Sequence, residues 1–181
     1  MAASEVAPAL VLVTVGTDHH PFDRLVDWVD RWLTDTTHAV RCVVQHGTSR
    51  TPSVAQGQPK FAYTDLQRLV AEAHVVVCHG GPGTIMDSRQ VGLTPIVVPR
   101  RHDLGEHVDN HQVRFTRRIA ESGLVRLAET ELRFRELVES SLADPRPPLP
   151  SPRAVNAETV LRFAEELAEL GPRRVRRLTR R

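Results

Sequence analysis

Short runs of β-branched apolar residues alternate with amphipathic segments of helical length along most of this chain, and this alternation restricts the possible folds more than any other feature. We expect strands at residues 10–15, 40–45, 75–78 and 95–98, with a weaker one near 60–63 and a short one at 124–127. Nearly continuous apolar runs are typical of strands that are covered on both faces. The pattern predicts an α/β fold, with a parallel sheet and helices on both faces.

Amphipathic segments between these runs predict the helices. Their apolar residues recur at the spacing of one helical face, and we expect helices at residues 22–33, 65–73, 84–91, 110–122 and 129–142. Gly123 is a suitable stop for the fourth of them. Trp28 and Trp32 lie one turn apart in the first helix, where we expect them to pack in the core or on a partner-facing patch and not to bind a ligand.

The composition changes after residue 143. The 181 residues can form one sizeable α/β domain, and we expect that domain at positions 1–143. Residues 144–152 contain five prolines in nine positions, which predicts an extended surface strap. A helix packing back on the domain is expected at 153–172, followed by a basic tail at 173–181.

Charge is distributed unevenly. The formal net charge is +2, but the tail holds six arginines and no acid, and removing them leaves −4 for the rest of the chain. An acidic body without an aromatic base-stacking motif argues against a nucleic-acid-binding protein. The two cysteines lie in apolar runs, which excludes a disulfide scaffold and fits a reducing compartment. No segment has the features of a membrane span or a targeting signal.

A glycine-rich turn joins a buried strand to a helix in the most informative stretch, VVVCHGGPGTIMD at residues 75–87. The glycines lie at the carboxyl end of the sheet, where open α/β sheets bind ligands. Because glycine has no side chain, a phosphate can approach the backbone, and the helix N-terminus favours its charge. We therefore predict an anion-binding loop that includes His79, Gly80, Gly81 and Gly83.

Thr84 and Asp87 lie about one turn apart on the helix that follows this loop. Thr84 can donate to a phosphate or cap the helix. Asp87 can accept the two hydroxyls of a ribose or form a capping box with Thr84. The spacing fits both interpretations.

A second glycine turn, VTVGTD at residues 13–18, follows the first predicted strand. Its single glycine matches neither the G-x-G-x-x-G fingerprint nor a Walker loop, so the dehydrogenase and P-loop interpretations lose their main support. The amides of Gly16 and Thr17 can still face an anion. His19 and His20 follow, and the pattern by itself gives them no role.

A third cluster, RRHDLGEHVDNHQ at residues 100–112, lies at the same predicted sheet edge and is polar nearly throughout. His107 and His111 have a helical spacing that can hold a metal with His102 or Asp109. Because there is no H-E-x-x-H motif and no closed ligand set, we expect no metal site and no cofactor. The cluster also contains neutral hydrogen-bond donors, which are better suited to binding phosphate or sugar hydroxyls than to binding a metal: Asn110, Gln112 and His107.

These clusters, in this order, resemble the C-terminal half of glycosyltransferase family 28. The resemblance is to MurG-like members and, more closely, to the cytosolic catalytic subunit of two-subunit UDP-N-acetylglucosamine transferases and its bacterial exopolysaccharide counterparts. It covers about residues 10–127 and rests on V-T-V-G-T at 13–17, F-x-Y-x-x-L at 61–66, C-H-G-G-P-G-T-I-x-D at 78–87 and V-P-R-x-x-x-x-x-E-H-x-D-N-H-Q at 98–112. It implies a Rossmann-like domain equivalent to the C-terminal, donor-binding half of the GT-B architecture.

The resemblance also implies how a UDP-sugar donor would lie. The backbone near Tyr63 would face uracil, and Asp87, where the family usually has glutamate, would hold the ribose. Gly16 and Thr17 would lie toward the cleft and the acceptor phosphates. The diphosphate and the sugar would be received by the remaining predicted donor-binding residues: His79, Gly80, Gly81, Gly83, Thr84, Glu106, His107, Asp109, Asn110 and Gln112.

The implied reaction is inverting transfer of a hexose-type sugar, such as N-acetylglucosamine, from a UDP-sugar to a polyprenyl-diphosphate-linked acceptor. Helix N-termini and loop donors would neutralise the departing UDP without a metal. A general base would deprotonate the acceptor hydroxyl. His19 is the candidate within this chain, and a residue of the missing half of the architecture is the other.

The acceptor-binding half of the GT-B architecture is absent from these residues, so we expect a membrane-anchored partner subunit that supplies it. We expect the chain to be cytoplasmic and peripheral at the inner face of the cell membrane. The arginine tail suits contact with an anionic membrane surface, or serves as a solubilising end. A non-catalytic UDP-sugar-binding or regulatory module is the alternative function.

Overall fold

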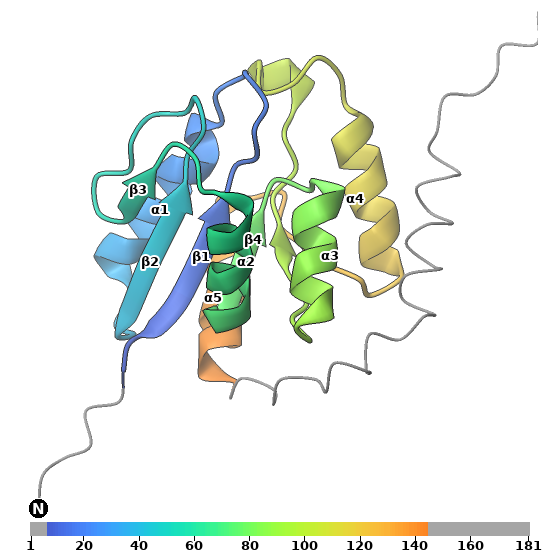
Figure 1. Ribbon diagram of the computed structural model, residues 1–181. Coiled ribbons are helices and arrows are strands. Elements are labelled where there is room, and N and C mark those ends of the chain that lie inside the picture. Colours follow the sequence, from blue (N-terminus) through green and yellow to red (C-terminus); the bar gives the residue numbers. More distant parts are fainter. Residues whose placement is uncertain (1–6, 145–181) are drawn as a thin grey trace, which may run out of the picture.

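A six-stranded sheet, parallel in every strand pair, forms the centre of the protein (Figure 1). The computed structural model describes residues 7–144, and the predicted strap, C-terminal helix and basic tail beyond Asp144 lie outside the described residues. The strand order is β3-β2-β1-β4-β5-β6, the doubly wound order of Rossmann-type domains. The predicted α/β fold class is confirmed.

Five of the six predicted strands lie at their expected places, with ends that differ by at most two residues. The strands are β1 Ala9–Thr14, β2 Val40–Gln45, β3 Gln56–Gln58, β4 Val75–Cys78, β5 Ile96–Val97 and β6 Arg126–Leu127. The strand expected near residues 60–63 is wrong. Tyr63 begins a helix, and the edge strand is β3, which is exposed and pairs with β2. A Gln-Gly-Gln segment has no apolar pattern, so only its pairing with β2 defines it as a strand.

All five predicted helices are present. They are α1 Asp23–Asp35, α2 Tyr63–Glu72, α3 Pro82–Gln90, α4 His111–Glu121 and α5 Glu131–Ala143, and a 3-10 turn, η1, covers His102–Leu104. None of the helices within residues 7–144 is long and apolar enough to cross a membrane.

Helices α1 and α5 cover one face of the sheet. Trp28 and Trp32 are buried there against Phe134, and their ring centroids lie 6.1 and 6.3 Å, respectively, from that of Phe134. The two tryptophans therefore belong to the core, as predicted. Alternate β1 residues, Val11 and Val13, point into the same cluster.

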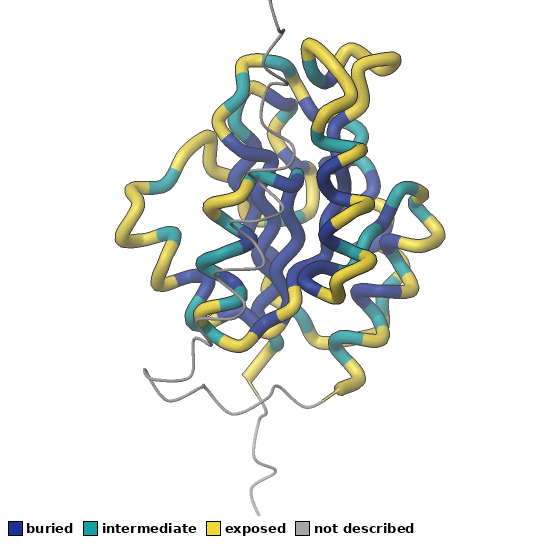
Figure 2. The backbone as a smooth tube through the Cα atoms, turned by 90° about the vertical axis from the view of Figure 1, so that its right-hand side faces the viewer, coloured by how far each residue is buried: buried dark blue, intermediate teal, exposed yellow. Residues whose placement is uncertain are grey.

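Helices α2, α3 and α4 cover the opposite face (Figure 1). Buried residues run along the strands in the middle of the molecule, while the outer faces of the helices are exposed (Figure 2). Cys42 and Cys78 are buried core thiols, and burial raises the pKa of each to about 12. Neither cysteine therefore forms a disulfide or an accessible thiolate.

β1 and β4 are neighbours in the sheet, and the strands that follow β1 along the chain are added on one side of it up to β3 and on the other side from β4 on. The loops that leave their carboxyl ends consequently separate toward opposite faces, and the crevice expected between such loops is the usual ligand site of doubly wound sheets. The β1–α1 loop, the β4–α3 loop and the β5–α4 loop, residues 98–110, all lie at this edge, which is at the top of Figure 1. The fold thus brings together the three clusters that the sequence marks.

Candidate functional site

The two glycine turns meet through the ring of His79. Gly16, after β1, has φ +82°, and a Cβ built on it would lie 2.5 Å from His79 Cε1. A Cβ on Gly81 would lie 2.6 Å from His79 Nε2. The space that these two glycines leave is therefore filled by an imidazole, which corrects the expectation that it is open to a phosphate.

His79 is uncharged in this position. Burial, with a further contribution from the Arg100 guanidinium, lowers the pKa of His79 to about 4. Its Nδ1 is buried without a hydrogen-bond partner. A neutral imidazole packed between the two turns fixes their relative position, which defines the floor of the crevice.

The first turn of α3 is the part of the glycine loop that is open to a ligand. The helix begins at Pro82 with Gly81 as its N-cap and no side-chain cap, so of the two roles considered for Thr84 the capping role is wrong. The amides of Gly83 and Thr84 have no partner within the helix. No acidic residue lies in this turn, and apart from the chain neighbours and the helix backbone no atom lies within 4 Å of a Cβ built on Gly83. A phosphate can approach here and meet the positive end of the helix dipole.

Asp87 faces α2, which packs beside α3. Gln67 Nε2 donates to the Tyr63 hydroxyl at 2.7 Å, and the hydroxyl is hydrogen-bonded to the Asp87 carboxylate. Burial raises the pKa of Asp87, and the bond from Tyr63 opposes that rise. Asp87 therefore forms no capping box with Thr84. The side chain of Tyr63 remains largely exposed at the start of α2.

Arg100, which was not among the predicted site residues, holds together the loops at this edge of the sheet. Its fully buried guanidinium donates to the carbonyls of Val15 at 2.6 Å, His20 at 2.7 Å and Glu106 at 3.0 Å. It also lies over the ring of Phe22, 4.9 Å from the centroid. Its position in the sequence could have indicated this role. Arg100 directly follows Val98-Pro99 at the end of the β5 run, and a charged residue there lies at the carboxyl edge of the sheet.

Glu106 is an internal anchor of the β5–α4 loop. Arg24 donates to both of its carboxylate oxygens at 2.8 Å, and the Arg101 amide donates to Oε2 at 2.9 Å. The side chain is almost fully buried. The structure therefore places this predicted donor-binding residue with its oxygens turned to protein partners.

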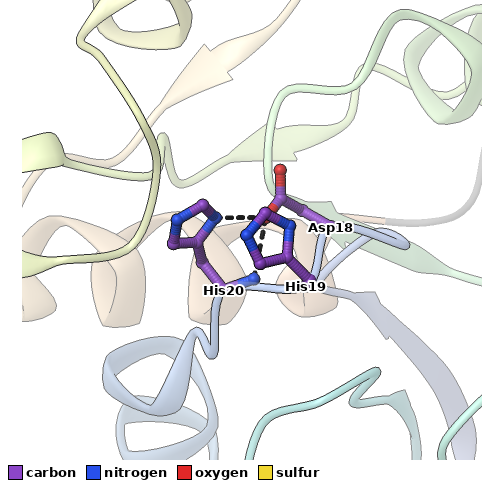
Figure 3. A group of neighbouring side chains, drawn as sticks. All are labelled: Asp18, His19 and His20. Atoms are coloured by element: carbon purple, nitrogen blue, oxygen red, sulfur yellow. Dashed lines mark hydrogen bonds and ion pairs between the residues drawn. The ribbon is translucent and has the colours of Figure 1, made fainter.

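Asp18, also not selected from the sequence, joins the β1–α1 loop to the β5–α4 loop. Its Oδ1 accepts from the His20 amide at 2.8 Å and bonds the His20 ring at 2.6 Å (Figure 3). Its Oδ2 lies 3.6 Å from Nε2 of His107. Burial would raise the pKa of Asp18, but the two His20 bonds and Arg100 lower it to about 2. The carboxylate is therefore ionised at neutral pH.

The two loop histidines differ in their surroundings. The His19 side chain is 81% exposed and lies 3.6 Å from Asp18, whereas His20 is held by Asp18 and by Arg100 through its carbonyl. The catalytic role predicted for His19 stays a prediction. By geometry, His20 is the more firmly oriented imidazole at this edge.

The start of α4 presents the remaining predicted residues. Asp109 accepts from the His111 amide at 2.8 Å, and Asn110 Oδ1 accepts from the His102 amide at 3.0 Å. Oε1 of Gln112 is buried without a hydrogen-bond partner. The His102 ring faces the His107 carbonyl at 3.0 Å. The rings of His107 and His111, which the helical spacing pairs, lie 4.7 Å apart, measured between their centroids.

An open pocket of about 430 Å³ lies beside the crevice, between the β5–α4 loop and α4. Of the predicted site residues, only Asn110 lines it. Arg101 and Arg117 in its wall are paired with Asp103 and Glu129. The crevice at β1 and β4, with its open amides, offers the better anion site.

Doubly wound strand order, with the strand succession reversing between β1 and β4, is the topology of one Rossmann-like half of the GT-B fold. The solved structures agree: MurG of Acinetobacter baumannii superposes with a TM-score of 0.57 at 15% identity, covering 94% of this chain and 49% of that one. An ALG13 solution structure superposes with a TM-score of 0.54 at 19% identity, covering 85% of this chain and 94% of that one.

The chain belongs to glycosyltransferase family 28, because the model of the family's C-terminal domain matches residues 10–168. A UDP-N-acetylglucosamine transferase subunit ALG13 of Yarrowia lipolytica is 31% identical over 116 residues, which are 58% of this chain and 57% of that protein. A UDP-N-acetylglucosamine–N-acetylmuramyl-(pentapeptide) pyrophosphoryl-undecaprenol N-acetylglucosamine transferase of Rubrobacter xylanophilus is 35% identical over 109 residues, 58% of this chain and 31% of that protein. The chain thus matches only part of each relative's length.

Proposed function

We propose that this chain binds the UDP-sugar donor in an inverting glycosyltransferase that moves a hexose-type sugar, such as N-acetylglucosamine, to a polyprenyl-diphosphate-linked acceptor. The observation that carries the proposal is the meeting of the α3 N-terminus, the Tyr63–Asp87 pair and the β5–α4 loop at one sheet edge. The named activities of the two relatives support the choice of donor.

In this proposal each part of the crevice receives one part of the donor. Asp87 and the backbone near Tyr63 hold the ribose and uracil, and the free amides of Gly83 and Thr84 receive the diphosphate. Negative charge grows on UDP as the sugar leaves, and amides already oriented toward it stabilise that charge without a metal. The sugar lies toward His107, Asn110 and Gln112.

Acceptor binding is assigned to a partner. In this proposal the described residues supply the donor side of a GT-B cleft, and a membrane-anchored subunit supplies the acceptor side and keeps this chain at the cytoplasmic face of the membrane. The base that takes the acceptor proton is His19, the neighbouring His20 that Asp18 orients, or a residue of that partner.

Calorimetric titration of the chain with UDP, UDP-N-acetylglucosamine and ADP tests the donor assignment. We expect both uridine nucleotides to bind and ADP to bind more weakly. Asp87→Ala removes a carboxylate that accepts hydrogen bonds, a loss of about 1.5 kcal/mol or roughly tenfold in affinity. Asp65→Ala is the matched control, because Asp65 is an exposed acid on α2 whose one ion pair within residues 7–144 is with Arg68, at 3.5 Å.

The outcomes separate the parts of the proposal. No binding of either uridine nucleotide at millimolar concentration would overturn it. Equal affinities in the intact chain and in Asp87→Ala would remove the ribose assignment and leave the diphosphate site standing. Binding of UDP-sugar without any transfer in the presence of the partner would favour the non-catalytic module.

A further inference from the structure

Four arginines line the open pocket of about 430 Å³ between the β5–α4 loop and α4, which we call the arginine pocket. Arg24 comes from α1, Arg101 from the β5–α4 loop, and Arg114 and Arg117 from α4. The last two are three positions apart and therefore lie on the same face of α4. Like charges that converge in this way repel one another unless acids or a bound anion balance them.

Acidic partners balance three of the four arginines, one acid for each: Arg24 with Glu106, Arg101 with Asp103, and Arg117 with Glu129. Arg114 is exposed and has no ion pair within residues 7–144. Since each of the other arginines is matched, the pocket has a surplus of one positive charge, and that charge belongs to Arg114.

The ion pairs also leave one nitrogen of each paired guanidinium unused. Arg24 and Arg101 donate to their acids through Nε and Nη2. Arg117 directs the same two nitrogens to Glu129, at 3.0 and 2.8 Å. The Nη1 atoms of these three arginines have no hydrogen-bond partner within residues 7–144. Arg24 is the most enclosed of them, yet its Nη1 is not among the fully buried, unpaired side-chain atoms of that range.

The unused donors suit an oxyanion with several acceptor oxygens. Guanidinium N–H groups match the geometry of phosphate and form strong, charge-assisted hydrogen bonds with it. Thr130 adds a neutral donor to the wall of the pocket. Its Oγ1 accepts from the Arg133 amide at 3.2 Å, which leaves the hydroxyl proton to donate. The volume of the pocket is within the range of small-molecule sites, about 300–1,000 Å³.

We propose that the arginine pocket binds a phosphate or diphosphate group of a small soluble ligand other than the UDP-sugar donor. Donors that converge from two helices and a loop on a concave space suit a compact ligand, whereas a membrane surface requires cations spread over a flat face. Of the residues assigned to the donor, only Asn110 reaches the wall of this pocket. The inference therefore goes beyond the proposed transfer reaction and holds whether or not the chain binds UDP-sugar.

Calorimetric titration of the intact chain with inorganic diphosphate tests the pocket. Arg114→Gln removes the surplus charge without breaking an ion pair of the described residues, and we expect it to weaken binding about tenfold. Glu129→Gln removes a negative charge and frees Nε and Nη2 of Arg117, so we expect it to tighten binding about threefold. Because a damaged fold does not raise affinity, these opposite shifts separate an effect on the site from an effect on folding.

Arg41→Gln is the matched control, since Arg41 is an exposed arginine on β2, outside the pocket wall and without an ion pair within residues 7–144. We expect its affinity for diphosphate to equal that of the intact chain. No binding of diphosphate by the intact chain at millimolar concentration would overturn the inference. So would equal affinities in the intact chain and Arg114→Gln, the result expected if diphosphate binds at the α3 N-terminus alone.

Cosedimentation with vesicles of phosphatidylglycerol separates a soluble ligand from a lipid headgroup, and uncharged phosphatidylcholine vesicles are the control. We expect the intact chain and Arg114→Gln to sediment with the anionic vesicles to the same extent. A loss of sedimentation in Arg114→Gln would overturn the assignment to a soluble ligand and assign the pocket to a phosphate headgroup of a lipid.

Discussion

Gly16→Ala tests the contact that joins the two glycine turns. Gly16 has φ +82°, a left-handed conformation that costs a residue with a Cβ about 1–2 kcal/mol. The new methyl group would lie 2.5, 2.6 and 2.9 Å from three ring atoms of His79. That ring cannot retreat, because it also fills the space beside Gly81. Overpacking of this kind adds about 1–3 kcal/mol.

We therefore expect Gly16→Ala to lower the free energy of unfolding by about 2–5 kcal/mol, measured by urea denaturation followed by circular dichroism. Gly83→Ala is the matched control: it lies in the first turn of α3, and apart from its chain neighbours and the helix backbone no atom lies within 4 Å of its Cβ position. Its free energy of unfolding should equal that of the intact chain or exceed it by up to about 1 kcal/mol, because alanine has a higher helix propensity than glycine.

A double variant separates the two causes. His79→Ala removes the ring, so the clash disappears in Gly16→Ala/His79→Ala while the backbone strain persists. The two substitutions should then cost less together than the sum of their separate effects, by about 1–3 kcal/mol. Gly16→Ala with the stability of the intact chain, or strictly additive effects, would refute the account of His79 as the contact between the turns.

Two further predictions concern buried charge. Glu106→Gln leaves the Arg24 guanidinium without its buried carboxylate partner, and we expect a loss of about 3 kcal/mol in thermal or urea unfolding, against less than about 1 kcal/mol for Glu136→Gln, whose ion pair with Arg133 is exposed. Burial would raise the pKa of Asp30, but two backbone amides and Arg50 lower it below 3.8 in the folded protein. Because the folded pKa is below the unfolded one, ionised Asp30 stabilises the fold above about pH 4, and this contribution is lost as the pH falls through the folded pKa. Between about pH 6 and about pH 2, the free energy of unfolding should therefore fall more steeply in the intact chain than in Asp30→Asn; parallel curves would contradict this.

Local pattern was sufficient for most of the fold. Continuous apolar runs predicted β1, β2, β4 and β5, and helical periodicity predicted all five helices, because both are set by residues within one turn or one strand. The short edge strand β3 was missed because Gln56–Gln58 has no apolar residue to mark it. Only its pairing with β2 makes it a strand.

The candidate site was predicted in outline. The glycine turns and the polar loop were placed at one sheet edge because parallel strands share their carboxyl ends. The helix start was placed two residues late, since Thr84 resembles a capping residue while Pro82 and Gly81 perform that task. Arg100 and Asp18 were passed over, because their roles depend on loops that are distant in sequence.

The sequence by itself determined the α/β class, the positions of the turns and the family, since these follow from periodicity, glycine placement and motifs in a fixed order. Tertiary structure decided which side chains meet. It filled the space at Gly16 with His79, turned Glu106 inward to Arg24, and brought His107 to Asp18. Such contacts join residues 63 to 89 positions apart, and their formation depends on how the loops pack once the sheet has fixed its strand order.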